Sequence, residues 1–114
     1  RFSKLGGEMV PHIQIEEELN KLLGASDDAM KCCVTAVSHP KKGERLIVLH
    51  TKLERSPDEL RKGLTEAGLP NLFIPTADSF FEVQKIPVLG TGKLDLKAMR
   101  SVAEERVKEE KVEA

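Results

Sequence analysis

The sequence predicts a single α+β domain, a small three-stranded sheet with packed helices plus a short N-terminal β-hairpin. Three observations support this fold class. Apolar residues recur at helical spacing in three segments of the chain. Three other segments are short apolar runs bounded by turn residues, and after the first dozen residues helix and strand patterns alternate. A length of 114 residues suits one domain with a modest core.

The first elements are a hairpin and a helix. Two half-apolar segments flank Gly6-Gly7, which predicts a hairpin over residues 2–10. A helix is expected over residues 11–23, with Pro11 in its first turn and Gly24 as its stop. Residues 16–18 are all glutamate and would lie near the end of the helix where the macrodipole favours anions.

The middle of the chain predicts two strands joined by a loop. Asp27-Asp28 marks a turn, and a strand follows over residues 31–38. A loop over residues 39–43 leads to a second strand over 44–53, whose apolar centre predicts burial on both faces. His50, near the end of that strand, is either a ligand or acid–base group or an ordinary core histidine, and no partner triad is visible in the sequence.

The last third predicts a helix, a strand and a second helix. Ser56-Pro57 opens a helix that ends at Gly68, and residues 69–75 read as an extended connection held by two prolines. A third strand is expected over residues 80–86. Asp95 then caps a helix with apolar residues at helical spacing.

Composition excludes several classes of function. Charged residues are 32% of the chain and the net charge is −1, so no broad attraction to nucleic acid or anionic lipid is expected. Cys32 and Cys33 are adjacent, which suits neither a disulfide nor a metal site and favours reduced thiols in the cytoplasm. No apolar run approaches a membrane span and no signal peptide is present. Because the chain opens on Arg1, we expect it to be part of a longer protein.

The loop Gly90-Thr91-Gly92-Lys93 lies between the third strand and the last helix. It reads either as a tight turn with a solvated lysine or as a Gly-rich turn that presents a cation to a carboxylate or phosphate. It is not a Walker loop, because the spacing differs and Leu94 replaces the hydroxyl residue. The sequence shows no nucleophile with a base, no paired carboxylates and no metal cluster.

The two Gly-rich loops together resemble one family. Residues 1–19, R-F-S-K-L-G-G-E-M-V-P-H-I-Q-I-E-E-E-L, resemble the segment after the inter-domain hinge of AMP-forming acyl-activating enzymes. Residues 86–100, I-P-V-L-G-T-G-K-L-D-L-K-A-M-R, resemble the end of their C-terminal domain, which carries the adenylation lysine. The match spans essentially the whole chain. The segment G-G-E-M-V-P-H-I is most similar to the branch of acyl-[acyl-carrier-protein] synthetase/2-acylglycerophosphoethanolamine acyltransferases.

This resemblance implies that residues 1–114 are the mobile C-terminal lid of a ligase whose large N-terminal domain, with most of the ATP, Mg and fatty-acid site, is absent. In the family a carboxylate attacks ATP to give an acyl-adenylate. The small domain then rotates, and a phosphopantetheine thiol displaces AMP. The isolated domain is expected to be inactive. The implied partners are the N-terminal domain, an acyl carrier protein, a fatty acid and a lysophospholipid, and the full-length protein would associate with the inner membrane.

The resemblance also implies the site residues. Lys93 matches the adenylation lysine, on a phosphate or carboxylate loop formed by Gly90, Thr91 and Gly92. The hairpin turn matches the loop that lines the thiol channel, and its residues are Gly6, Gly7 and Glu8.

Three departures from the family pattern surround these motifs. Gln14 replaces an acidic residue, Leu96 replaces an arginine, and Pro87-Val88-Leu89 replaces P-K-T. They affect the expected contacts with the large domain rather than Lys93 or Gly7. A stand-alone module that docks a carrier protein or regulates a partner remains the alternative, and a purely structural domain is the third. The sequence leaves open the acyl chain length, the acceptor thiol, a fused acyltransferase and the oligomeric state.

Overall fold

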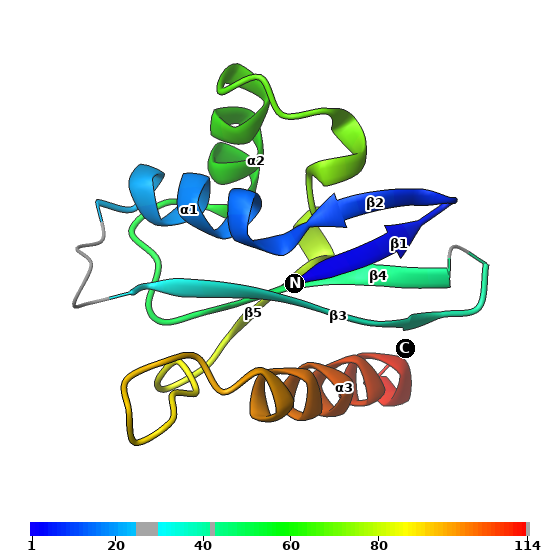
Figure 1. The fold of residues 1–114 in the computed structure, drawn as a ribbon, viewed down its shortest axis with the longest axis vertical. Helices are drawn as coiled ribbons and strands as arrows, with labels where there is room; N and C mark the ends of the chain where they lie inside the picture. Colours follow the sequence, from blue (N-terminus) through cyan, green and yellow to red (C-terminus); the bar gives the residue numbers. More distant parts are fainter. Residues whose placement is uncertain (25–29, 42, 114) are drawn as a thin grey trace.

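The computed structural model describes residues 1–24, 30–41 and 43–113, and it has the predicted α+β architecture (Figure 1). A two-stranded hairpin precedes a three-stranded sheet whose strands lie in their order along the chain. The first two strands of this sheet are antiparallel, and the third joins the second in parallel. The first two helices of the chain cover one face of the sheet and the last helix covers the other, which gives three layers (Figure 1).

The hairpin consists of β1 (Phe2–Leu5) and β2 (Glu8–Pro11). Gly6 and Gly7 form its turn with φ angles of +55° and +90°, the sign that a two-residue type I′ turn requires at both positions. The hairpin prediction is confirmed. Pro11 is not in the first helical turn as expected, because it still pairs with Phe2 as the last residue of β2.

Helix α1 (His12–Leu22) begins directly after Pro11. Ile15 and Leu19 lie on its buried stripe, as the spacing predicted. The prediction that residues 16–18 interact with the macrodipole is wrong, since no acidic residue lies in the first turn of α1. Glu16 instead faces the sheet and is only 6% exposed.

The sheet is formed by β3 (Cys32–His39), β4 (Gly43–His50) and β5 (Phe80–Glu82). The predicted burial of β4 on both faces is confirmed, because its residues 46–49 are all buried. Strand β5 is shorter than the expected residues 80–86. Its pairing stops at His50↔Glu82, where β4 itself ends and offers no further edge.

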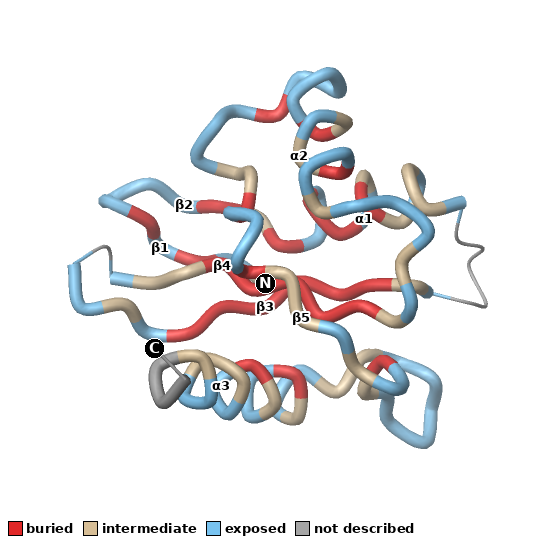
Figure 2. Tube along the Cα trace, turned by 180° about the vertical axis from the view of Figure 1, so that it is seen from behind, coloured by how far each residue is buried: buried red, intermediate tan, exposed pale blue. Residues whose placement is uncertain are grey.

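Alternation along β3 and β4 gives the domain two apolar cores (Figure 2). Cys32 and Val48 face α1 and α2, and Cys33 and Leu49 face α3. On the α3 side, Met99 and Ala103 pack into the second core, and both are almost fully buried. Because both faces are covered, the exposed loops rather than the sheet remain available for function.

The remaining elements follow the predicted order. Ser56 caps α2 (Pro57–Glu66), with its Oγ accepting from the Glu59 backbone N–H at 3.2 Å. The connection after α2 is not simply extended, because it contains the 3₁₀ turns Asn71–Phe73 and Ala77–Ser79. Asp95 caps α3 (Leu96–Glu113) as expected, with Oδ1 accepting from the Ala98 N–H at 3.0 Å. The turn predicted at Asp27-Asp28 lies outside the described residues.

Candidate functional site

Residues 90–93 form the tip of a tight excursion between β5 and α3 (Figure 1). Below the tip, Val88 and Leu94 form an antiparallel bridge. The Leu89 N–H donates to the Lys93 carbonyl at 2.7 Å, and the Gly92 N–H donates to the Leu89 carbonyl at 2.9 Å. Gly92 has a φ of +89°, a conformation that explains the glycine at this position. The backbone that carries Lys93 is therefore fixed by hydrogen bonds.

The residues of the tip are open to solvent. Gly90, Thr91, Gly92 and Lys93 are all exposed, and a Cβ on either glycine would meet no atom of the described residues within 4 Å, apart from its immediate chain neighbours. Within the described residues, no carboxylate forms an ion pair with Lys93. The ammonium is thus held on a fixed base and carried by a flexible stem, an arrangement that can reach an anion outside this chain.

The hairpin turn is the second predicted loop, and Gly6, Gly7 and Glu8 are exposed. A Cβ on Gly7 would meet no atom of the described residues within 4 Å, apart from its chain neighbours, so among those residues the positive φ alone accounts for the glycine. Gly6 also lines a groove of about 730 Å³ between the hairpin, β4 and the 3₁₀ segments. Arg45 in the groove wall already donates to Ser79 Oγ and to the Asp78 carbonyl, each at 3.0 Å.

The structure does not bring the two loops together. The hairpin lies on the α1 side of the sheet and the tip lies on the α3 side, at opposite ends of the domain in both views (Figures 1 and 2). A small ligand could therefore contact only one loop at a time. An enzyme that used both would have to turn the domain between two steps.

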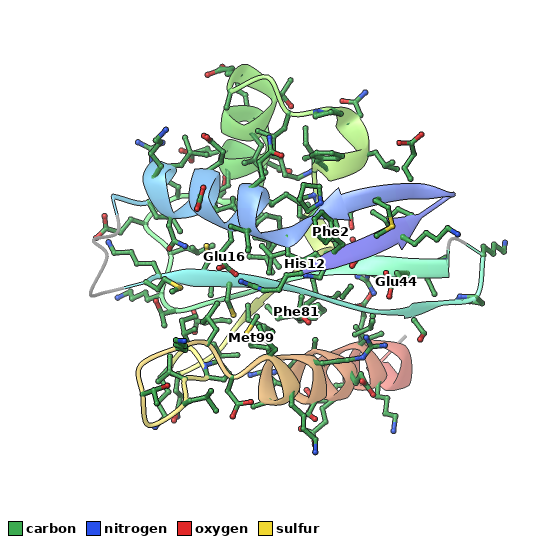
Figure 3. All side chains as sticks on the ribbon, in the orientation of Figure 1. Phe2, His12, Glu16, Glu44, Phe81 and Met99 are labelled. Carbon is green, nitrogen blue, oxygen red and sulfur yellow. The ribbon has the colours of Figure 1, made fainter. Side chains whose placement is uncertain are left out.

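An ion pair that the sequence analysis missed anchors the first residue. The Arg1 guanidinium donates two hydrogen bonds to the Glu16 carboxylate, at 3.0 and 2.7 Å, and a third to the Val34 carbonyl at 2.7 Å. The same carboxylate accepts from the Val34 N–H at 2.8 Å. Figure 3 shows Glu16 between α1 and the sheet. The only sign of this ion pair in the sequence is a glutamate next to Ile15 on the buried stripe, and it does not indicate which residue pairs with it.

His12 forms a second buried polar contact at the junction of β2 and α1. Its Nε2 forms a short hydrogen bond with the Ser3 hydroxyl, and both residues are buried. Burial, and then the nearby charge of Arg1, lowers the pKa of His12 to about 4. The imidazole is therefore neutral at pH 7. Ser3 is only 1% exposed, so this pair does not form an accessible nucleophile and base.

This burial predicts a pH dependence of stability. Between pH 6.5 and 4 the unfolded chain binds a proton at residue 12 that the folded chain does not. The free energy of unfolding should fall as pH drops through this window, by roughly 3 kcal/mol at the acid end. Urea unfolding of the wild type and of His12→Gln between pH 7.5 and 4.5 measures this. The variant should lose that part of the slope, and identical slopes would contradict a buried neutral histidine.

The other candidate groups have structural roles. His50 is buried, its Nδ1 lies 2.8 Å from the Thr51 carbonyl, and its ring packs near Phe80, so the core interpretation is the one that applies. Cys32 and Cys33 lie on opposite faces of the sheet, as predicted, and both are free and buried. Burial raises the pKa of Cys33 to about 12 and also raises that of Cys32, which makes both thiols poor nucleophiles.

The described residues contain neither a metal-binding cluster nor a membrane-spanning helix. Residues 1–24, 30–41 and 43–113 contain no group of three or more His, Cys, Asp or Glu side chains that could hold a metal ion. Within the same ranges, no helix has the length and apolar character needed to cross a bilayer.

The fold is similar to parts of several solved enzymes, although no protein-family model matches the chain. The amide bond synthetase McbA of Marinactinospora thermotolerans is 22% identical with a TM-score of 0.71, over 88% of this chain and 19% of that one. The fatty acyl CoA synthetase of Mycobacterium tuberculosis is 20% identical with a TM-score of 0.72, over 88% and 19%. ATP-bound MatB of Rhodopseudomonas palustris is 19% identical with a TM-score of 0.68, over 89% and 19%.

These similarities define the architecture. The hairpin, three-stranded sheet and packed helices of this chain share their fold with part of each of these solved proteins. The chain spans about a fifth of the length of the solved proteins it resembles.

Proposed function

We propose that this chain is the C-terminal domain of an ATP-dependent, adenylate-forming acid–thiol ligase. The observation that carries the proposal is the tip at residues 90–93, where a hydrogen-bonded turn presents Lys93 to partners outside the chain. The resemblance of both Gly-rich loops to acyl-activating enzymes supports it, as does the likeness of the fold to a fatty acyl CoA synthetase and to an ATP-bound relative.

In the first half-reaction a carboxylate oxygen attacks the α-phosphorus of ATP, and pyrophosphate leaves. Negative charge develops on oxygens of both reactants, and a preorganised cation stabilises that charge. Lys93 supplies this cation from the tip. ATP would bind mainly to the large N-terminal domain. Mg would be held there too, since the described residues of this chain offer no carboxylate cluster for it.

In the second half-reaction a thiol displaces AMP from the acyl-adenylate. The hairpin turn, with Gly7 at its end, would line the path of the phosphopantetheine arm that carries the thiol. The two loops lie on opposite sides of the sheet, so one rotation of a rigid domain would exchange them at the reaction centre (Figure 1). This arrangement supports the separate roles that the resemblance implies for the two loops.

The finer proposal concerns the substrates. The sequence of residues 6–13 is most similar to that of acyl-[acyl-carrier-protein] synthetase/2-acylglycerophosphoethanolamine acyltransferases. We therefore propose a fatty acid as the carboxylate and an acyl carrier protein as the thiol donor, with a lysophospholipid as final acceptor if an acyltransferase is fused.

The test is pyrophosphate exchange with the full-length gene product. Fatty-acid-dependent exchange between ATP and labelled pyrophosphate is expected, followed by thioester formation with holo-acyl carrier protein. Residues 1–114 alone should fold but show neither exchange nor tight ATP binding, because they hold one loop of the adenylation site. If no carboxylic acid supported ATP–pyrophosphate exchange by the full-length protein, the ligase assignment would be wrong. Thioester formation with CoA alone would contradict only the carrier-protein assignment.

A further inference from the structure

The outer edge of the hairpin lies against the start of β4. Along an antiparallel strand, backbone groups alternate between pairing with the partner strand and pointing away from it. Lys4 is at a position of β1 that points away from β2, and its N–H donates to Glu44 Oε2 at 2.6 Å. A Cβ on Gly43 would lie 3.3 Å from the Lys4 carbonyl oxygen. The first two residues of β4 therefore contact both backbone groups of one residue in the hairpin.

The contact between Lys4 and Glu44, which we call the tether, is a charge-assisted hydrogen bond. A carboxylate that accepts from a backbone N–H binds it roughly twice as strongly as a neutral acceptor does. Glu44 is half-buried and lies at the start of β4, on the same face of the sheet as the hairpin (Figure 3). Because the donor is the backbone, the tether does not depend on the side chain at position 4.

The tether lies two residues before the hairpin turn. At the other end of β1, the Arg1 carbonyl accepts from the His12 N–H at 3.0 Å, so the strand is held at both ends. Leu5, between the tether and the turn, is buried in the first core. Gly6 and Glu44 line the same groove. The position of the turn relative to the groove wall therefore depends on the tether.

We propose that Glu44 is a positioning residue for the second half-reaction, because it holds the hairpin turn in the place where the thiol arm passes. This inference rests on the proposed function, in which residues 6–8 line the path of the arm. Glu44 acts through the Lys4 backbone and not on the reacting atoms. Misplacing a reacting group by about 1 Å can slow a reaction by roughly 10²-fold, so a turn that shifts would slow attack by the thiol. Lys93 lies across the sheet, and adenylate formation should not depend on Glu44.

The first test compares Glu44→Ala with Glu44→Gln in the full-length enzyme. Alanine removes the acceptor, whereas glutamine keeps a neutral acceptor oxygen. Thioester formation from added acyl-adenylate should fall about tenfold with alanine and about threefold or less with glutamine, as expected for loss or weakening of one charged hydrogen bond. The loss should appear in kcat, while KM for the carrier protein and the rate of adenylate formation are kept. The matched control is Glu66→Ala, which removes an exposed glutamate at the end of α2 and should leave both half-reactions unchanged.

The second test removes the donor instead of the acceptor. Proline has no N–H and is accepted where the N–H of a strand points away from its partner strand, so Lys4→Pro should also slow thioester formation about tenfold. The double variant with Glu44→Ala should be no slower than either single variant, because both remove the same hydrogen bond. Lys4→Ala keeps the N–H and should have no effect. Losses that multiply to roughly 100-fold in the double variant would mean that the two residues act independently, and would overturn the tether.

The third test detects the tether without activity. Amide hydrogen exchange at residue 4 of the full-length enzyme, read by mass spectrometry of fragments, should be at least tenfold faster in Glu44→Ala than in the wild type or in Glu66→Ala. Equal exchange at residue 4 would show that the tether does not form. Wild-type enzyme that forms no acyl-adenylate would contradict the proposed function and this inference with it. Active enzyme in which Glu44→Ala leaves thioester formation unchanged, or slows both half-reactions equally, would overturn the positioning role of Glu44 alone.

Discussion

Replacing Lys93 with alanine in the full-length enzyme is expected to slow adenylate formation by roughly 10²–10³-fold, the usual scale for loss of one preorganised electrostatic group. Lys93 is exposed and no described carboxylate forms an ion pair with it, so the variant removes no internal interaction of this kind. Stability should change by no more than about 0.5 kcal/mol, as is usual for surface substitutions. The measurement is single-turnover formation of acyl-adenylate at saturating ATP.

The control for Lys93→Ala is the second half-reaction. Supplied with acyl-adenylate, the variant should transfer the acyl group to the thiol at the wild-type rate, because the tip lies across the sheet from the hairpin (Figure 1). Lys93→Arg should rescue adenylation only in part, since a planar guanidinium differs in shape and donor geometry from an ammonium. An equal loss in both half-reactions, or none in adenylation, would leave residues 90–93 as a turn without a catalytic role.

Replacing Gly7 with leucine is expected to slow the second half-reaction and to leave the first nearly unchanged. Thioester formation should fall by roughly 10²-fold, the cost of misplacing a reacting group, while adenylation is nearly unchanged. A Cβ at Gly7 meets no described residue within 4 Å other than its chain neighbours, so a leucine would extend into the space proposed for the phosphopantetheine arm. Separate rates for the two half-reactions measure this selectivity.

The Gly7 variant also strains the turn, and the chain offers a matched control for that effect. A leucine at φ +90° costs on the order of 1–3 kcal/mol. Gly68 has a φ of +91° and equally open surroundings, but it follows α2 rather than the hairpin. Gly68→Leu should therefore lower the melting temperature as much as Gly7→Leu and leave both half-reactions intact. If both variants lost thioester formation equally, strain and not the channel would be responsible.

Local sequence patterns were enough to predict the short elements of the fold and the two candidate loops. The glycines at positions 6 and 7, the cap at Ser56 and the cap at Asp95 act over a few residues, so each could be predicted from its neighbours. The apolar centre of β4 predicted its burial on both faces for the same reason. Because both candidate loops are short and local, their residues were also found from sequence, and their proposed roles stay predictions.

Contacts between residues far apart in the chain could be seen only in the folded protein. The pairing of Arg1 with Glu16 and Val34 depends on how α1 lies on β3, and no pattern along the chain encodes that contact. The end of β5 was set by the end of its neighbour β4 rather than by its own residues. The opposite placement of the two loops and the exposure of residues 90–93 likewise follow from packing on both faces of the sheet, since burial is a property of the assembled layers and not of a residue type (Figure 2).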